Sequence, residues 1–286
     1  MTPEHKYDTN TRVVKCPVCE IESRFLPLKV GVDIFRCPSC DHCFTDVSVM
    51  EAHEPYDEDY FLVRHPNWFN NPNYKLFDYI SKALNGLASG PKILDVGCGK
   101  GDLLRYLHKH NPKLKLSGID FTKNQPTPEI EFHCGDVFEL AESHTFDAIV
   151  SLAVIEHIED VSKFINKLQR LLNPNGIVIL MTVDERSLLY SLSRLFGKLT
   201  YWGPATRLYE RHHLNHFNRS SLRRLMELNR LTVIEARDHV IPIAAVDFDS
   251  SSRFNAAILK LGVRVIFTLA RLIHRSHTQT IICNKG

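Results

Sequence analysis

The chain has 286 residues, 44% hydrophobic and 24% charged, which is ordinary for a globular protein of one large or two smaller domains. Its net charge of +2 conceals an asymmetry, since residues 1–60 carry 6 basic and 12 acidic side chains (−6) and residues 186–286 carry 16 and 6 (+10). No secretory signal is present, and no uncharged apolar run reaches the roughly 18 residues of a membrane span. We therefore expect a cytoplasmic protein.

Two Cys-x-x-Cys pairs near the N-terminus are separated by 17 residues. Eight cysteines without an export signal favour metal ligands or free thiols over disulfides. Each pair places two sulfurs on one tight turn, and Zn²⁺ prefers four thiolates. The spacing predicts a zinc ribbon at residues 1–50, with His42 or Cys43 as alternative ligands and the matched structural set of Cys16, Cys19, Cys37 and Cys40. Because this module is acidic, its charge disfavours nucleic acid and favours a structural or docking role.

Residues 51–91 are expected to connect the ribbon to the main domain. The stretch before residue 74 is rich in aromatic side chains, Asn and Pro, and residues 74–84 fit an amphipathic helix. The aromatic stretch is interpreted either as an ordered linker packed on the main domain or as a lid over a ligand.

From residue 92 onward, strand and helix patterns alternate. The convincing helix covers 161–172, and the connection at 121–128 is too short and proline-rich for a full helix. Such alternation predicts a parallel sheet with crossover helices, and ligands bind at the carboxyl ends of its strands. We expect strands at 92–96, 114–120, 131–136, 146–152 and 177–183, and an antiparallel pair at 231–240 and 278–283.

The turn at residues 97–101, Gly-Cys-Gly-Lys-Gly, is the most informative segment. Its glycines allow a sharp turn and a close approach of ligand to backbone. The pattern is not the Gly-x-Gly-x-x-Gly of dinucleotide-binding proteins, and Asp95 beside it would repel a pyrophosphate but suits an ammonium group. Asp120 closes the next strand, where a carboxylate can accept ribose hydroxyls. These residues indicate a nucleoside ligand with a cationic, amino-acid-like arm.

Six segments carry a resemblance to a known family. They are Ile-Leu-Asp-Val-Gly-Cys-Gly-Lys-Gly (93–101), Gly-Ile-Asp (118–120), Cys-Gly-Asp-Val (134–137), Phe-Asp-Ala-Ile-Val-Ser (146–151), Ile-Glu-His-Ile (155–158) and Leu-Leu-Asn-Pro-Asn-Gly-Ile-Val-Ile-Leu (171–180). With them, residues 92–183 resemble the class I S-adenosylmethionine-dependent methyltransferases. The resemblance implies a Rossmann-like α/β fold, a seven-stranded, mostly parallel sheet with an antiparallel last strand.

The same resemblance implies the cofactor site. Gly97 and Gly99 back the methionine arm, Asp120 takes the ribose, and Asp136 and Val137 contact adenine. The segment from Ser151 to Ala153 lines the sulfonium side. The full set of expected cofactor-binding residues is Asp95, Gly97, Cys98, Gly99, Gly101, Asp120, Phe121, Asp136, Val137, Ser151, Leu152 and Ala153.

The whole chain, with its cysteine pairs and Tyr-Asp-Glu-Asp-Tyr-Phe at 56–61, is similar to a bacterial subgroup of these enzymes. That subgroup includes sugar C-methyltransferases and methyltransferases of surface-polysaccharide and lipid pathways. Resemblance to ribosomal-RNA guanine methyltransferases with an N-terminal zinc site is looser.

Three histidines are candidates for a catalytic base. His157 follows the strand at 146–152 by a few residues, and an ordinary imidazole pKa suits proton removal near neutral pH. His213 and His216 lie just before a helix that Ser220 is predicted to cap, and a His-Leu-x-x-Phe element at this place is usual in the subgroup. The alternative is that these histidines only order a loop or pack against the helix.

Residues 186–219 and 241–276 are expected to form a helical C-terminal cap on the 92–286 domain. Within 187–199 six large apolar side chains share one face, and in 253–275 five basic side chains fall within about 60° of a helical wheel. A basic stripe beside a wide apolar face fits either a cap packed on the domain or a helix in contact with the inner membrane surface.

The sequence thus predicts a methyltransferase that uses S-adenosylmethionine and structural Zn²⁺. Its acceptor would present O or C on a small sugar-like, lipid-linked or carrier-bound molecule. The alternatives are an RNA methyltransferase, which the acidic ribbon disfavours, and a non-catalytic zinc scaffold, which the intact glycine turn disfavours.

Overall fold

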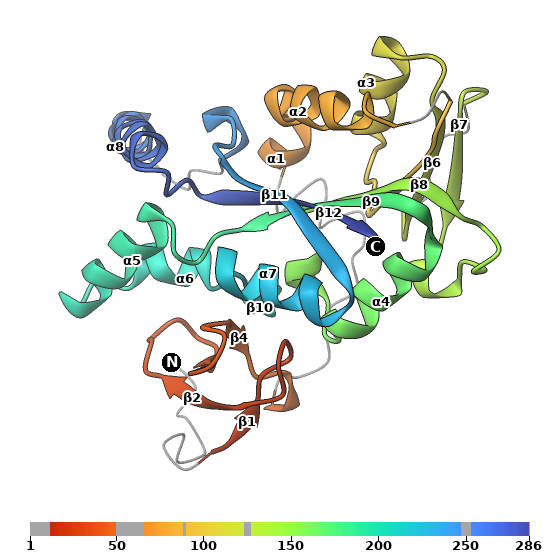
Figure 1. Cartoon of the computed structure of the whole chain (residues 1–286). Coiled ribbons are helices and arrows are strands. Elements are labelled where there is room, and N and C mark those ends of the chain that lie inside the picture. The colour runs from red at the N-terminus through yellow and green to blue at the C-terminus, as the bar shows by residue number, and fades with distance from the viewer. Residues whose placement is uncertain (1–11, 50–65, 88–89, 123–126, 247–252, 286) are drawn as a thin grey trace.

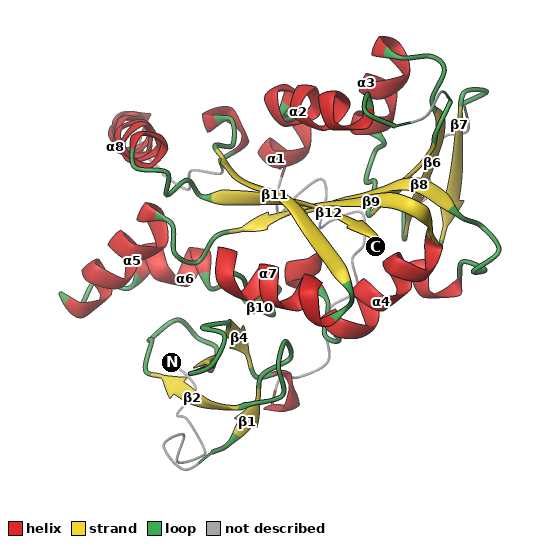
Figure 2. Cartoon of the chain, viewed as in Figure 1, coloured by secondary structure: helices red, strands yellow, loops and turns green. Residues whose placement is uncertain are grey.

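The computed structural model describes residues 12–49, 66–87, 90–122, 127–246 and 253–285. A seven-stranded sheet forms the centre of the molecule, and a smaller five-stranded sheet lies below it (Figures 1 and 2). Helices α2 (Tyr74–Leu84) and α3 (Asp102–His110) cover the upper face of the large sheet, and α4 (Val161–Leu171) and α7 (Arg219–Leu228) cover the lower face.

The large sheet confirms the fold that the sequence predicts. Its strand order is β11-β12-β9-β8-β5-β6-β7, and the neighbouring strands β9, β8, β5, β6 and β7 pair in parallel. Strand β12 runs antiparallel to both of its neighbours. The strands are β5 (Lys92–Val96), β6 (Lys115–Asp120), β7 (Ile130–Cys134), β8 (Phe146–Leu152), β9 (Leu172–Val183), β11 (Leu231–His239) and β12 (Thr278–Lys285).

The central strands are apolar on both faces because helices cover both. In β5, Leu94 packs with the α4 and α7 side, whereas its neighbour Ile93 packs with α2 and α3. In β8, Ile149 and Val150 alternate in the same way. This period of two lets each strand bury side chains on both faces. Because these strands pair in parallel, their carboxyl ends lie at one edge of the sheet.

Two strand boundaries differ from the prediction. β7 ends at Cys134, because Gly135 adopts φ +150° and Asp136 caps the 3₁₀ turn η3 (Val137–Glu139). β9 begins at Leu172, directly after α4, and therefore includes the Asn-Pro-Asn-Gly at 173–176, which precedes the strand predicted at 177–183. The described part of the connection between β6 and β7 contains no helix, as predicted.

The five-stranded sheet joins the ribbon to the main domain. Its order is β1-β2-β3-β4-β10, and the last strand comes from the C-terminal third of the chain. β4 pairs antiparallel with β10, placing Cys43 opposite His216. The ribbon was expected to be a module of residues 1–50, yet a distant strand completes its sheet. Its strands are β1 (Val14–Lys15), β2 (Glu22–Leu26), β3 (Ile34–Arg36), β4 (Cys43–Thr45), followed by η1 (Val47–Val49), and β10 (Asn215–His216).

Helix α7 begins two residues earlier than predicted, because its N-cap is Asn218 and not Ser220. Asn218 caps it, because its side chain accepts a hydrogen bond from the Ser221 amide at 2.9 Å and its own amide donates to Ser221 Oγ at 3.0 Å. The prediction that Ser220 caps this helix was wrong, since Ser220 lies inside it. Asn218 also donates to the backbone oxygen of Asp41 at 2.7 Å, so the cap fixes the ribbon as well.

The remaining helices frame the edges of the sheet. α5 (Leu188–Lys198) buries Tyr190, Ser193 and Gly197 rather than its leucine-rich face. α8 (Arg253–Leu272) lies at the far left in Figure 1, next to α5. Among the described residues no helix combines the length and apolarity needed to cross a bilayer. The other short elements are α1 (Pro66–Asn70), η4 (Ile155–His157), α6 (Gly203–Leu208) and η5 (Ile243–Ala245).

Candidate active site

The glycine turn leaves the carboxyl end of β5 in a conformation that requires glycine. Gly97 and Gly101 have φ angles of +72° and +77°. A Cβ at Gly97 would lie 2.3 Å from a methyl group of Val154, and one at Gly101 would lie 2.8 Å from the ring of Phe132. Both positions are therefore closed to larger residues by backbone strain and by contact.

Asp120 connects this turn to the end of β6. One carboxylate oxygen accepts the Gly99 amide at 2.8 Å, and the other accepts the amide and hydroxyl of Thr122 at 2.9 and 2.7 Å. The Gly135 amide donates to the backbone oxygen of Asp120 at 2.9 Å, which brings the end of β7 alongside. The ends of β5, β6 and β7 thus meet as the sequence predicts.

Asp95 is buried beside these groups, with 3% of its surface exposed. Burial, together with the nearby charge of Asp120, raises the pKa of its carboxyl to about 8. A carboxyl held in this way gains most from a positively charged neighbour. An ammonium or sulfonium group at this position would restore its ionised form.

A pocket of about 750 Å³, counting the space at its mouth, opens at this edge of the sheet. Its lining includes Leu152 at the end of β8 and four residues at the end of β5, namely Asp95, Gly97, Cys98 and Gly99. Five residues of the expected cofactor set therefore share one pocket.

The other expected cofactor residues lie outside the lining of that pocket. Phe121 is 61% exposed beyond β6, and Asp136 caps η3 through the Phe138 amide at 3.0 Å. Val137 is buried in the core on the α4 side, and Gly101 is the N-cap of α3.

The end of β8 carries two further members of the expected set. Ser151 is 1% exposed, and among the described residues its hydroxyl has no hydrogen-bond partner. Ala153 has a φ of +56°, a left-handed conformation that is costly for a residue with a Cβ. Its amide donates to Met181 at 2.9 Å, which holds the chain turned at the edge of the pocket.

Residues from two further segments complete the lining of the pocket: Trp68 and Asn73 from the aromatic stretch, and Ile241 and Pro242 beyond β11. From sequence the aromatic stretch is interpreted as a linker or as a lid over a ligand, but none of these four residues is identified as lining a pocket. The side chain of Asn73 donates to the backbone oxygen of Val240 at 3.3 Å and so joins the two segments. The density of Asn, Pro and aromatic residues at 66–74 was the available signal. The rest of that stretch, including 56–61, lies outside the described residues.

The candidate histidines gather in a separate buried cluster. The ligand atoms of Glu156, His157 and His213 all lie within 4.8 Å of one another, a spacing that could hold a metal ion. The ring nitrogen Nδ1 of His157 lies 2.9 Å from the backbone oxygen of His212. None of the three lines the pocket at the glycine turn.

The environment of this cluster shifts its acids and bases in opposite directions. Burial raises the pKa of Glu156 to about 7, although Thr182 donates to its carboxylate at 2.8 Å. Burial and the nearby His213 lower the pKa of His157 to about 3. His157 is therefore neutral at physiological pH.

His216 has a different environment from the other two. It is fully buried in β10, with the ring of Tyr209 at 4.8 Å, and neither ring nitrogen has a hydrogen-bond partner among the described residues. Burial lowers its pKa well below the ordinary value. This position matches a packing histidine, whereas His157 and His213 are only half-buried.

The four cysteine sulfurs of the ribbon form a compact group. Cys16 and Cys40 are 3.6 Å apart, and Cys19 is 3.5 Å from both Cys37 and Cys40. Four thiolates about 2.3 Å from a tetrahedral zinc ion would be about 3.8 Å apart, so the residues fit the metal.

The alternative ligands His42 and Cys43 are not in this group. The imidazole of His42 pairs with Asn215 at 3.1 Å, and Cys43 packs with Val183 and Tyr190.

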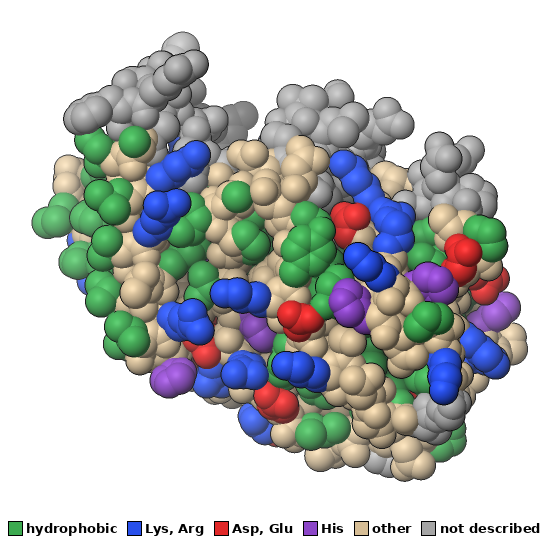
Figure 3. All heavy atoms as spheres, turned by 90° about the horizontal axis from the view of Figure 1, so that it is seen from above, with side chains coloured by type: hydrophobic (Ala, Val, Ile, Leu, Met, Phe, Trp, Pro, Cys, Tyr) green, Lys and Arg blue, Asp and Glu red, His purple; other side chains and the backbone are tan. Residues whose placement is uncertain are grey.

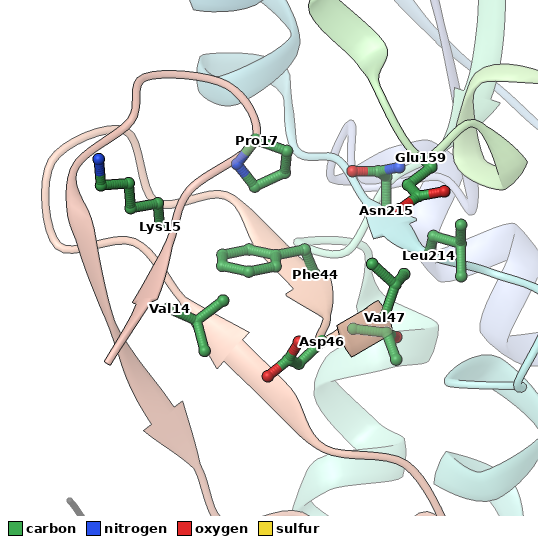
Figure 4. Close-up of a pocket in the computed structure, with 10 residues that line it drawn as sticks. Val14, Lys15, Pro17, Phe44, Asp46, Val47, Glu159, Leu214 and Asn215 are labelled. Carbon is green, nitrogen blue, oxygen red and sulfur yellow. The ribbon is translucent and has the colours of Figure 1, made fainter. Parts of the chain in front are cut away.

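The ribbon meets the main domain close to the histidine cluster. The Thr45 amide donates to Leu214 at 2.8 Å, and Arg36 forms an ion pair of 2.7 Å with the buried Glu185. A hollow of about 370 Å³, counting open space, lies at this junction (Figure 4). Glu159 and Asn215 of the main domain line it opposite Phe44 of the ribbon.

Comparison with known proteins agrees with the fold and the glycine turn. Together these features define a class I S-adenosylmethionine-dependent methyltransferase. Residues 68–236 match the family described as methyltransferase domain. This match covers more than half of the chain, so the chain belongs to that family.

Curated relatives cover the central part of the chain. The ubiquinone biosynthesis O-methyltransferase of Alkalilimnicola ehrlichii is 32% identical over 120 residues, which is 38% of this chain and 47% of that protein. The match with the enzyme of the same name from Rhodopseudomonas palustris covers 46% of that protein. The chain thus spans about half the length of these relatives.

Among solved structures, Haemonchus contortus phosphoethanolamine N-methyltransferase 2, in complex with S-adenosyl-L-methionine, has a TM-score of 0.55 at 16% identity. The match covers 85% of this chain and 62% of that protein. At this level of identity the likeness shows the fold alone.

Proposed function

We propose that this methyltransferase transfers a methyl group from S-adenosylmethionine to a hydroxyl oxygen of a lipid-like or lipid-linked acceptor. The observation that carries the proposal is the mixed lining of the pocket at the glycine turn. Asp95 and the turn contribute to this lining together with Trp68, Ile241 and Pro242. A pocket lined by a buried carboxyl and by apolar side chains suits a cationic donor beside an apolar acceptor.

The comparisons support the oxygen acceptor in a limited way. The curated relatives are named ubiquinone biosynthesis O-methyltransferases, and they align with the central part of this chain. We extend the O-methylation in that name to this chain as part of the proposal. A sugar-like or carrier-bound acceptor is the competing possibility.

The chain's own groups have defined tasks in this scheme. Bound S-adenosylmethionine supplies the electrophilic methyl group. Asp95 meets the positive charge, and Asp120 holds the turn in place and accepts the ribose hydroxyls. Holding the acceptor oxygen in line with the methyl carbon supplies much of the rate enhancement.

His157 is the proposed base for the acceptor proton. Its ring is neutral at physiological pH, and the charge of Glu210 favours the imidazolium once the proton is transferred. Methyl transfer to the acceptor oxygen would require that oxygen to lose its proton. Because His157 does not line the pocket at the glycine turn, we propose that the proton reaches His157 through water.

Calorimetry with S-adenosylmethionine and S-adenosylhomocysteine tests the cofactor site. Wild type should bind both, and Asp120→Ala should abolish binding because the turn loses its tie and the ribose its acceptor. Glu142→Ala removes an exposed carboxylate paired with Arg170 and should bind like wild type. Wild type that binds neither compound would remove the proposal.

The acceptor class is tested by incubation with cofactor labelled in the methyl group. A membrane lipid extract and a pool of nucleotide sugars are offered separately, and mass spectrometry locates the label. We expect label in the lipid extract, on oxygen. Label confined to the sugars would leave the methyltransferase standing and overturn the acceptor.

The role of His157 is tested with His157→Gln and with the exposed control His144→Gln. Loss of a general base should lower kcat by about 10²–10⁴-fold and leave S-adenosylhomocysteine binding unchanged. Unchanged turnover across the pH range in His157→Gln would exclude His157 as the base.

A further inference from the structure

Helix α8 presents three different stripes around its circumference. At about 100° per residue, Val263, Phe267 and Ala270 share the side that faces the protein. Phe267 and Ala270 are 5% and 2% exposed, and the Phe267 ring stacks on His277. Within residues 257–272, all side chains outside this narrow side are exposed except that of the half-buried Ile266.

A second stripe is apolar and exposed. It follows the spacing i, i+3, i+7, i+11 and i+14, which keeps its members on one side of a helix. Each is about half exposed or more: Ile258 54%, Leu261 63%, Val265 51%, Leu269 49% and Leu272 71%. A continuous row of five such side chains marks an interaction surface.

A third stripe, next to the apolar one, is basic. Lys260, Arg264 and Arg271 are exposed along it. Arg275, which follows the helix, anchors its end, because its guanidinium donates to the Arg186 carbonyl and to Ser191 Oγ, both at 2.9 Å. The segment 253–275 contains no acidic residue.

The far end of α5 extends this surface. Leu195, Phe196 and Leu199 are 51%, 41% and 69% exposed, and Tyr201 just beyond is 65% exposed. α5 contacts α8, and both lie at the same edge of the molecule (Figure 1, left). Seen from above, hydrophobic side chains gather along that edge with Lys and Arg beside them (Figure 3, left).

We propose that the exposed apolar and basic stripes of α8, with the end of α5, form a docking surface for an anionic lipid bilayer. A helix of 20 residues is about 30 Å long and can lie flat with its apolar stripe among the acyl chains. The adjacent basic stripe then lies at the level of the lipid phosphates. Negative lipid headgroups complement a segment that carries only positive charge.

The charge pattern favours a bilayer over a second copy of the chain. Pairing two α8 helices through the apolar stripe would bring two basic stripes close together with no acidic partner on either helix. Such like-charge contacts oppose association. The inference is independent of the acceptor, although a lipid-linked acceptor would be met at the same surface.

Vesicle flotation of the full-length protein tests the proposal. Vesicles of phosphatidylcholine alone are compared with vesicles that also contain phosphatidylglycerol. Wild type should float with the anionic vesicles, and added salt should weaken its binding. Leu261→Glu with Leu269→Glu should abolish flotation, because two charges would enter the apolar layer. Arg264→Glu and Arg271→Glu should each weaken binding at least about fivefold, the effect of losing one basic contact.

Matched controls separate this surface from general effects. Ile234→Glu changes an apolar side chain that is 59% exposed on β11, and Arg224→Glu reverses an exposed charge on α7; both should float like wild type. Cofactor binding by calorimetry, equal in all variants, shows that the fold and the methyltransferase site are intact. Flotation that is absent in wild type, or equal in wild type and the α8 variants, would overturn the proposal. A dimer in sedimentation that Leu261→Glu dissociates, without vesicle binding, would assign the surface to a second copy.

Discussion

The glycine-turn pocket and the histidine cluster each hold a buried carboxylate whose pKa is raised, yet their neighbours differ. Asp95 has another carboxylate, Asp120, beside it and opens onto a pocket. Glu156 has a hydroxyl donor and two imidazoles within reach. At the first site a bound cation would balance the charge of the carboxylate. At the second site the groups around the carboxylate all come from the protein itself.

The two regions also differ in how the chain assembles them. The turn depends on consecutive residues after β5 and on the ends of neighbouring strands. The cluster depends on the segment 212–216, whose strand β10 pairs with β4 of the ribbon. Disturbing the ribbon should therefore damage the cluster and spare the turn.

The largest effect is expected from loss of the structural zinc that we propose for the four ribbon cysteines. Cys37→Ser, or removal of metal by a chelator, should unfold the ribbon, because small zinc modules draw about 10 kcal/mol or more from the metal. Methyl transfer should fall to background, while S-adenosylhomocysteine binding at the turn persists within a few-fold. Metal content, calorimetry and activity are measured together.

Cys43→Ala is the matched control, since Cys43 is buried in the ribbon but is not part of the sulfur group. It should retain the metal. Purified wild type without metal would contradict the zinc assignment, and equal loss of binding and turnover in Cys37→Ser would contradict the separation of the two regions.

A change at the turn should have the reverse pattern. Gly97→Ala would place a Cβ 2.3 Å from Val154 at a φ of +72°, and we expect cofactor affinity to fall at least about 100-fold with the ribbon and its metal intact. Gly262→Ala on α8 has no atom within 4 Å of the new Cβ and serves as control. Near-normal affinity of Gly97→Ala would show that this wall of the pocket is not rigid.

The raised pKa of Asp95 predicts a pH dependence of stability. A carboxyl with a folded pKa of about 8 and an unfolded pKa near 4 stabilises the fold most when protonated. Its contribution is complete below about pH 4 and is lost as the pH rises through 8, on the order of a few kcal/mol.

Thermal melts of the cofactor-free protein should therefore decline from pH 6 to pH 9 more steeply in wild type than in Asp95→Asn. Saturating cofactor should flatten the wild-type decline, because a cation restores the ionised form. Parallel pH profiles for the two proteins, with or without cofactor, would refute a buried, protonated Asp95.

The smallest effect concerns the contact between the ribbon and α7. Asn218→Ala removes the cap of the helix and the hydrogen bond to Asp41, at a cost of about 1–2 kcal/mol. Ser220→Ala, at the position predicted from sequence, should change the free energy of unfolding little, since Ser220 is exposed within the helix. Denaturant unfolding measures both, and an equal loss in the two variants would count against the Asn218 cap.

The sequence by itself determined the parts that depend on neighbouring residues. The Asp95-to-Gly101 turn is legible because glycine spacing and an adjacent acid act locally, and alternating strands and helices follow from apolar periodicity. The four ribbon cysteines could be identified from the sequence because each Cys-x-x-Cys pair forms one turn. The prediction of Ser220 as the cap was wrong because Asn218, two residues earlier, is also a residue type that caps helices. Only the backbone shows at which of the two the helix begins.

Tertiary structure decided what depends on distant segments. It joined β10 to the ribbon, brought Trp68 and Ile241 into one pocket with the glycine turn, and kept His157 and His213 out of the lining of that pocket. It also left the apolar row of α8 and the far end of the α5 row exposed, although their periodicity alone fits a packed cap equally well. Periodicity shows that a helix has an apolar face; which partner covers that face is a property of the assembled fold.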